Sequence, residues 1–163
     1  MNRFVTISLL ALVSLAGCGR SGPPEDARKA ADIVSGDSKG SASDNPVCRL
    51  FSEAEASAFI GEAVEAGGNA AMGQGCQWAA KDGDGEVTVA IVPADYEERA
   101  SSAQGFREVP AAGKDGFVVP DMGGWVAGAV AGKSFYRVTV AGSKASDSSA
   151  LALLGETIKR KPS

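Results

Sequence analysis

The chain contains no histidine among its 163 residues. Histidine is the most frequent general base near neutral pH and the commonest ligand of transition metals, so its absence argues against enzymes that depend on it. Positive charge is also sparse, because 16 Lys and Arg stand against 20 Asp and Glu, giving a net charge of -4. Nucleic acid requires clustered positive charge. We therefore expect no nucleic-acid partner, and we interpret the basic residues 159–161 as a helix end.

Long apolar runs are absent except at the start of the chain. Asn2 and Arg3 precede a nearly continuous apolar stretch at residues 4–15. This stretch is shorter than the roughly 20 apolar residues that a membrane-spanning helix needs. A positive start, a short apolar stretch and small residues after it are typical of a secretory signal. We interpret residues 1–17 as a leader and predict that the chain is exported.

The apolar stretch ends in Leu15-Ala16-Gly17-Cys18, which resembles the lipobox of bacterial lipoproteins. The resemblance implies cleavage before Cys18 and attachment of lipid to its thiol, often with acylation of the new amino group (palmitate is a typical chain). Two or more chains give a stable anchor, whereas one chain is marginal. The alternative is an ordinary signal peptide or an uncleaved anchor in which Cys18 has no role.

The residue after Cys18 is Gly19 rather than Asp. By analogy with enterobacterial sorting, this favours the outer membrane, facing the periplasm, in a cell with two membranes. In a cell with one membrane the same anchor would hold the protein at the outer face of the cell membrane. Residues 18–45 are rich in Gly, Ser, Pro, Asp and Lys. Such a composition buries too little apolar surface to fold, and we predict a flexible tether.

Cys48 and Cys76 are the remaining cysteines. Export favours disulfide formation, and lipidation of Cys18 leaves an even number of thiols. We predict a Cys48–Cys76 disulfide that closes a loop of roughly 29 residues and contributes about 3–4 kcal/mol to stability. The alternative is two buried free thiols.

Residues 46–163 are expected to form one domain. Ser52 and Glu55 form a capping box before a helix at residues 53–60. Ser146 caps a last helix whose apolar face carries Leu151, Leu154 and Ile158, supported by Ala150. Alternation of apolar residues predicts hairpins. The expected strands are residues 63–66, 75–79, 86–92, 106–109, 117–119, 124–131 and 134–141, with a further polar helix at residues 95–103.

This order of elements predicts an α+β fold. It consists of a mainly antiparallel sheet of hairpins with two or three helices packed on it and one disulfide.

Two aromatic residues are candidate binding residues. Trp125 follows two glycines, which can expose its ring for recognition, and Tyr96 is the one sizeable apolar residue of the polar helix. Aromatic residues are enriched at binding hot spots. Core packing is the alternative for Trp125. Trp78, which adjoins the predicted bridge, is interpreted as a core residue.

Metal and cofactor sites are not expected. Residues 82–86 superficially resemble the start of a calcium loop, but Pro93 stands where the last ligand of an EF-hand would be. The carboxylate pairs Glu62/Glu65 and Glu97/Glu98 are interpreted as solvated, because nothing places them in an apolar pocket.

Residues 48–56, with the later Cys76-Gln77-Trp78, resemble a group of small exported bacterial lipoproteins that carry a domain of unknown function. The resemblance covers most of residues 47–160, and it implies no catalytic residues. We expect a non-catalytic envelope module that binds a protein or small ligand while it is tethered to the membrane through lipid on Cys18. An inhibitor or immunity-type partner protein is one alternative. A carboxylate- or serine-dependent envelope enzyme is the other.

Overall fold

The computed structural model describes residues 44–97, 99 and 101–161. The predicted leader, the lipidation of Cys18 and most of the predicted tether lie outside these residues. The described helices and strands are, in chain order, α2 (Glu53–Ile60), β1 (Gly68–Ala70), η2 (Ala71–Gly73), β2 (Gly75–Ala79), β3 (Glu86–Pro93), η3 (Ala94–Tyr96), β4 (Arg107–Glu108), η4 (Pro110–Ala112), β5 (Lys114–Asp121), β6 (Gly124–Ala131), β7 (Ser134–Ala141) and α3 (Asp147–Lys159).

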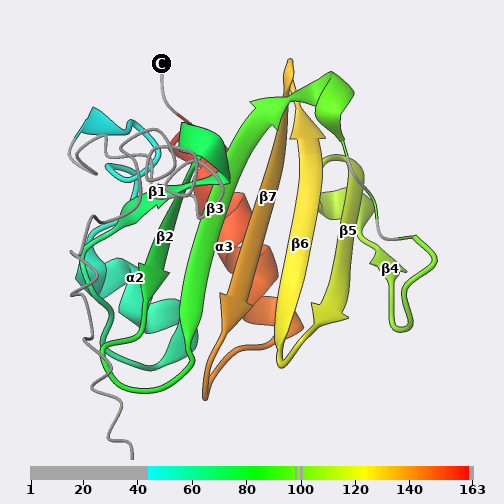
Figure 1. The fold of residues 1–163 in the computed structure, drawn as a ribbon. Helices are drawn as coiled ribbons and strands as arrows, with labels where there is room; N and C mark the ends of the chain where they lie inside the picture. Colours follow the sequence, from blue (N-terminus) through cyan, green and yellow to red (C-terminus); the bar gives the residue numbers. More distant parts are fainter. Residues whose placement is uncertain (1–43, 98, 100, 162–163) are drawn as a thin grey trace, which may run out of the picture.

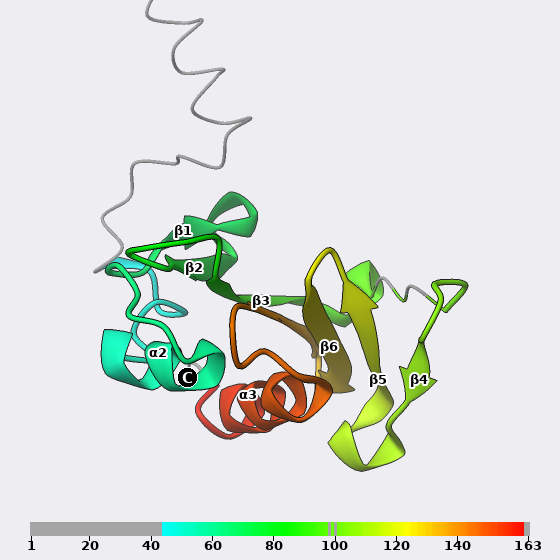
Figure 2. The same cartoon turned by 90° about the horizontal axis from the view of Figure 1, so that it is seen from below.

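The strands form a single antiparallel sheet in the order β1-β2-β3-β7-β6-β5-β4. Both α-helices lie against the same face of this sheet, and α3 is seen behind β7 and β6 in Figure 1. Figure 2 shows the same arrangement from below, with α2 and α3 on one side of the curved sheet. The predicted α+β fold is therefore confirmed. In the described part of the chain, no helix has both the length and the apolar composition to cross a membrane.

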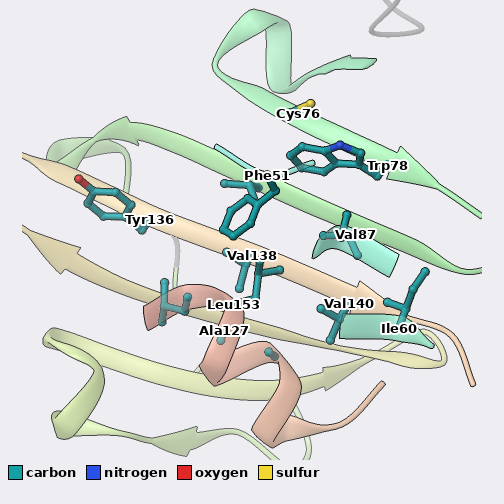
Figure 3. Packing of buried hydrophobic residues seen from close by; sticks show 14 of the residues in the cluster. Phe51, Ile60, Cys76, Trp78, Val87, Ala127, Tyr136, Val138, Val140 and Leu153 are labelled. Carbon is teal, nitrogen blue, oxygen red and sulfur yellow. The ribbon is translucent and has the colours of Figure 1, made fainter. Parts of the chain in front are cut away.

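The main core lies between the sheet and the helices. Alternate residues of β3 and β7 point into it, as their spacing in the sequence predicted, and they are fully or almost fully buried: Val87, Val89, Tyr136, Val138 and Val140. Figure 3 shows the side chains of β7 between those of β3 and Leu153 of α3. Because β7 pairs with β3 on one side and β6 on the other, it forms the centre of the sheet.

Cys48 and Cys76 form the predicted disulfide, with Cα atoms 5.0 Å apart. The bridge joins the segment that precedes α2 to the second strand of the sheet. Beside it, Trp78 is 1% exposed. Its ring meets Phe51 edge to face, with centroids 6.1 Å apart, as Figure 3 shows. Disulfide and aromatic packing therefore hold the start of the domain onto β2.

The start of α2 is held by the predicted capping box. Ser52 Oγ accepts from the Glu55 backbone N–H at 3.3 Å, and the Glu55 carboxylate accepts from the Ser52 backbone N–H at 2.9 Å. Arg160, just after α3, donates to the same carboxylate at 2.8 Å and to the Leu50 carbonyl at 3.0 Å. Its guanidinium also lies 4.8 Å from the centre of the Phe51 ring. Arg160, which follows α3, therefore stabilises the residues at the start of α2.

The last helix begins at its predicted cap, Ser146, and its buried face includes the predicted Ala150 and Leu154 but not Leu151 and Ile158. Its fully buried residues are Ala150, Leu153, Leu154 and Thr157. Leu151 and Ile158 are partly buried at the border of this face. Thr157 satisfies its hydroxyl within the helix by donating to the Leu153 carbonyl at 2.7 Å. The sequence pattern counted only apolar residues and therefore left out Thr157. The predicted face was consequently rotated by about one residue from the buried face.

The helix predicted at residues 95–103 is wrong. The chain forms only the short η3 helix, after which Glu97 has extended backbone angles, and the described residues of this range contain no α-helix. Its expected anchor, Tyr96, is 70% exposed. A polar segment of this length without a buried face lacks the tertiary contacts that stabilise short helices.

Two strand predictions need correction. The strand expected at residues 63–66 is reduced to a single bridge between Val64 and Ala80, and β1 forms later. Strand β5 is longer than expected, because Pro120 does not end it. Strand β4 pairs only with residues 117 and 118 of β5, so Pro120 occupies an edge where no backbone donor is needed.

We predict that Cys48→Ala lowers the free energy of unfolding by about 3–4 kcal/mol, because the cross-link no longer restricts the unfolded chain. The variant keeps Cys76 in the core and therefore opens no cavity beside Trp78. Urea unfolding of both proteins, made in a Cys18→Ser background, measures the difference. An equal stability of the two chains, or two titratable thiols in the parent, would contradict the bridge.

We also predict a pH dependence that originates at Glu55. Its pKa is lowered from 4.5 to about 2, first by the hydrogen bond from the Ser52 backbone and then by that from Arg160. A lowered folded-state pKa adds stability above about 4.5 that is lost as the pH falls towards 2. Glu55→Gln keeps a capping side chain and removes this part of the dependence.

Urea unfolding between pH 2 and pH 7 tests this expectation. The difference in stability between the parent and Glu55→Gln is expected to shrink as the pH falls below 4.5. Glu53→Gln is the matched control, because Glu53 lies in the same helical turn but faces Lys81 at 3.8 Å. A constant difference across the whole pH range would refute the assignment to Glu55.

Candidate functional site

The face of the sheet that points away from the helices carries a second apolar cluster. Its members are buried and occupy alternate positions of β5, β6 and β7: Phe117, Val119, Val126, Val130 and Phe135. The segment between η3 and β4 lies over part of this face and adds Phe106, while β3 adds Val92. We call this surface the outer face. Because both faces of the sheet are apolar here, the outer face needs a cover that the helices do not supply.

Stacked aromatic rings cross the outer face from the edge inwards. The rings of Phe106 and Phe117 have centroids 5.6 Å apart, and those of Phe117 and Phe135 are 6.4 Å apart. Gly128 on β6 makes this possible. A Cβ atom at this position would meet the Phe117 ring at 2.7 Å and the Phe135 ring at 3.0 Å. The glycine therefore provides the space in which the two rings lie across the middle strand.

The covering segment packs on the sheet through Phe106, whose ring stacks on Phe117, and it is also held by polar contacts. Arg99 donates to the Glu108 carboxylate at 3.1 Å, and its guanidinium lies 5.7 Å from the centre of the Phe106 ring. At the other end of the sheet, the Ala94 N–H donates to the Lys133 carbonyl at 3.0 Å. Beneath the segment, Phe117, Val119 and Val126 are each at most 3% exposed.

A hollow of about 130 Å³ lies between the covering segment and strands β5, β6 and β7. Its apolar residues come from β5, β6 and the covering segment, and its two charged residues come from β5 and β7. The complete lining is Ala103, Phe117, Val119, Pro120, Asp121, Val126 and Arg137. The hollow therefore combines an apolar floor with one positive and one negative side chain.

Arg137 and Asp121 both lack a partner within the described part of the chain. Neither forms a hydrogen bond or an ion pair through its side chain there, and both are exposed. The neighbours of Arg137 in register are Gly128 on β6 and Ala90 on β3. Because these residues have no side chain beyond Cβ, nothing on the adjacent strands shields the guanidinium from a ligand.

This arrangement can bind a molecule, but it carries little catalytic chemistry. The hollow contains neither a nucleophilic side chain nor a general base other than Asp121, which is exposed to water. Among residues 44–97, 99 and 101–161, no group of three or more His, Cys, Asp and Glu side chains is placed to hold a metal ion.

The two predicted binding aromatics do not belong to this site. Trp125 lies on the helix-facing side of β6, partly buried against the main core. Tyr96 projects from η3 at the other end of the sheet. Trp125 is paired with Val140 near the end of β7. Helix η3 follows the end of β3, and the end of β3 is paired with the start of β7. The structure therefore keeps Trp125 and Tyr96 apart, and a binding role for either stays a prediction.

The predicted carboxylate pairs also have other surroundings. Glu62 accepts a hydrogen bond from the Ser143 backbone N–H at 2.7 Å, which ties the end of α2 to the loop before α3. Glu65 is exposed, Glu97 lies 3.6 Å from Arg99, and Glu98 is outside the described residues. Residues 82–85 form the turn between β2 and β3.

The sequence contains one signal for the outer face, and it lies in the last strand. Alternation in the last strand places Phe135 and Arg137 together on the side opposite Tyr136 and Val138. A phenylalanine beside an arginine on the face opposite the core indicates a second apolar surface with a charge on it. The strand predicted at residues 117–119 was too short to show that Asp121 lies on the same side.

We predict that Gly128→Ala destabilises the domain by about 1–3 kcal/mol, because the new methyl group overlaps the Phe117 and Phe135 rings. Gly155→Ala is the matched control. Gly155 lies in α3, and no atom comes within 4 Å of the position that a methyl group would take there, so alanine should stabilise the helix by about 0.5–1 kcal/mol. Urea unfolding measures both. Equal effects at the two glycines would refute the role assigned to Gly128.

Comparison with known proteins identifies a family. A family model described as a protein of unknown function (DUF3558) matches residues 13–156. No curated protein and no solved structure matches. The match covers both α-helices almost completely, the whole sheet and both bridged cysteines. Since it spans most of the sequence, the chain belongs to the DUF3558 family of proteins of unknown function.

Proposed function

We propose that this protein is a lipid-anchored module of the bacterial cell envelope that binds a ligand without chemical conversion. The observation that carries the proposal is the Cys48–Cys76 bridge. It pairs two of the three cysteines and leaves Cys18, at the end of the lipobox-like Leu15-Ala16-Gly17-Cys18, as the third. A disulfide of this kind also suits an exported protein, because the cytosol keeps thiols reduced.

The range of the family match is consistent with this interpretation. It begins at residue 13 and so includes the lipobox-like residues as well as the domain. We propose that the lipid on Cys18 holds the domain at the membrane, and that the chain between them is a tether. Gly19 after the cysteine supports the outer membrane in a cell with two membranes.

The binding role is supported by the hollow on the outer face. It offers apolar contact and two charged side chains without partners in the described part of the chain, which are the features of a small-molecule site. The sequence contains no histidine, and the hollow has no nucleophile. These features favour recognition over catalysis, and a small ligand or a segment of an envelope protein is the expected occupant.

We predict that Cys18→Ser moves the protein from the membrane to the soluble fraction, because no acyl chain can be attached to serine in this way. Membrane fractionation of the producing cells, with mass spectrometry of the N-terminal peptide, gives the result. Cys48→Ser is the matched control. It removes the bridge but keeps Cys18, so that chain should stay with the membrane. A Cys18→Ser protein that stays membrane-bound would contradict the anchor.

A further inference from the structure

We propose that the hollow on the outer face binds a small zwitterion with an apolar body, of about the length of a dipeptide. The proposal deepens the binding role given above and rests on it. It assigns the apolar body to Phe117, Val119 and Val126. It assigns the anionic end of the ligand to Arg137 and the cationic end to Asp121.

The size of the hollow fits a small apolar group. Its volume is about 130 Å³, close to that of an engineered apolar cavity of about 150 Å³ that holds benzene. The residues of the floor are firmly placed, since Phe117, Val119 and Val126 are each at most 3% exposed, and the apolar surface that they offer a ligand is correspondingly small. A floor that is rigid and already buried does not have to be ordered when a ligand binds, which favours affinity.

The two charges set the class of the ligand. Arg137 and Asp121 line the same hollow but do not form an ion pair with each other. Their Cα atoms are two strands and four residues apart, or about 16 Å by the ordinary spacings of a sheet. Their side chains extend from the same face and close only part of this distance. A ligand with one charge at each end can therefore bridge them across the apolar floor.

A ligand with a single charge would leave one of these side chains unused. An anion that reached along the whole hollow would place negative charge beside Asp121, and a cation would approach Arg137. Like charges at such distances repel. Asp121 therefore selects against an extended dianion and Arg137 against an extended dication. A peptide with free termini has the required charges at its two ends, and its length is set by its residues.

The experiment uses three related probes with the full chain in detergent micelles. Valyl-valine carries both charges, N-acetyl-valyl-valine lacks the cation, and valyl-valine amide lacks the anion. Leucyl-leucine and phenylalanyl-phenylalanine extend the series in size. Isothermal titration should show saturable binding of at least one free dipeptide. Each blocked form should bind about three- to tenfold more weakly, as expected for the loss of one partly exposed charge contact.

Two variants identify the partners of the charges. In Arg137→Gln the preference for the free carboxylate over the amide should disappear, while the preference for the free ammonium stays. In Asp121→Asn the reverse is expected. Lys133→Gln is the matched control, because Lys133 is an exposed cation in the β6–β7 turn outside the hollow, and it should keep both preferences. Unchanged melting temperatures show that each variant is folded.

Some outcomes would overturn the proposal. These are no saturable binding of any free dipeptide, equal binding of free and blocked forms, or charge preferences that Arg137→Gln and Asp121→Asn leave unchanged. The titration does not require lipid on Cys18. A failure of the anchor, seen by fractionation, and a failure of the zwitterion site, seen by titration, are therefore separate results.

Discussion

The Cys48–Cys76 bridge and the aromatic contact beside it determine how this domain is closed. The segment before α2 has no strand of its own among the described residues. It is attached to the sheet by the disulfide and by the packing of Phe51 against Trp78. The Asn45 side chain adds a hydrogen bond, which it donates to the Gly75 carbonyl at 2.8 Å. These contacts hold α2 against the face of the sheet formed by β3 and β7. A small domain gains much from such a covalent link, because its core alone buries limited surface.

Arg160 completes this closure from the other end of the chain. It contacts the Phe51 ring, the Leu50 carbonyl and the Glu55 carboxylate. Each contact alone is exposed and weak, because water and salt screen it. Together they join the end of α3 to the same few residues that the disulfide holds. The two ends of the described domain are therefore stabilised as one unit, and the helix-facing core lies beneath it.

Local patterns predicted those parts of the fold that local forces determine. The capping box at Ser52, the hairpin of β6 and β7 and the Cys48–Cys76 bridge were all predicted from short sequence signals, and all are present. The expected helix at residues 95–103 failed because its polar residues gave no information about the long-range contacts of Phe106 and Arg99. The hollow was missed for the same reason. It depends on Gly128, whose lack of a side chain has meaning only when Phe117 and Phe135 lie on either side of it.

The register of the sheet places the hollow away from the point at which the chain enters the domain. Asn45 bonds to Gly75, which is paired with Ala90 near the end of β3. Asp121 and Pro120 are paired with the start of β6. The start of β6 is paired with the end of β7, and the end of β7 is paired with the start of β3. Ala90 is also paired with Arg137, so Gly75 and Arg137 lie at the same level along the strands, and the entry and the hollow are separated mainly across the sheet, from β2 at one side to β5 towards the other. The lateral separation follows from the strand order alone, because β2 and β5 are divided by β3, β7 and β6.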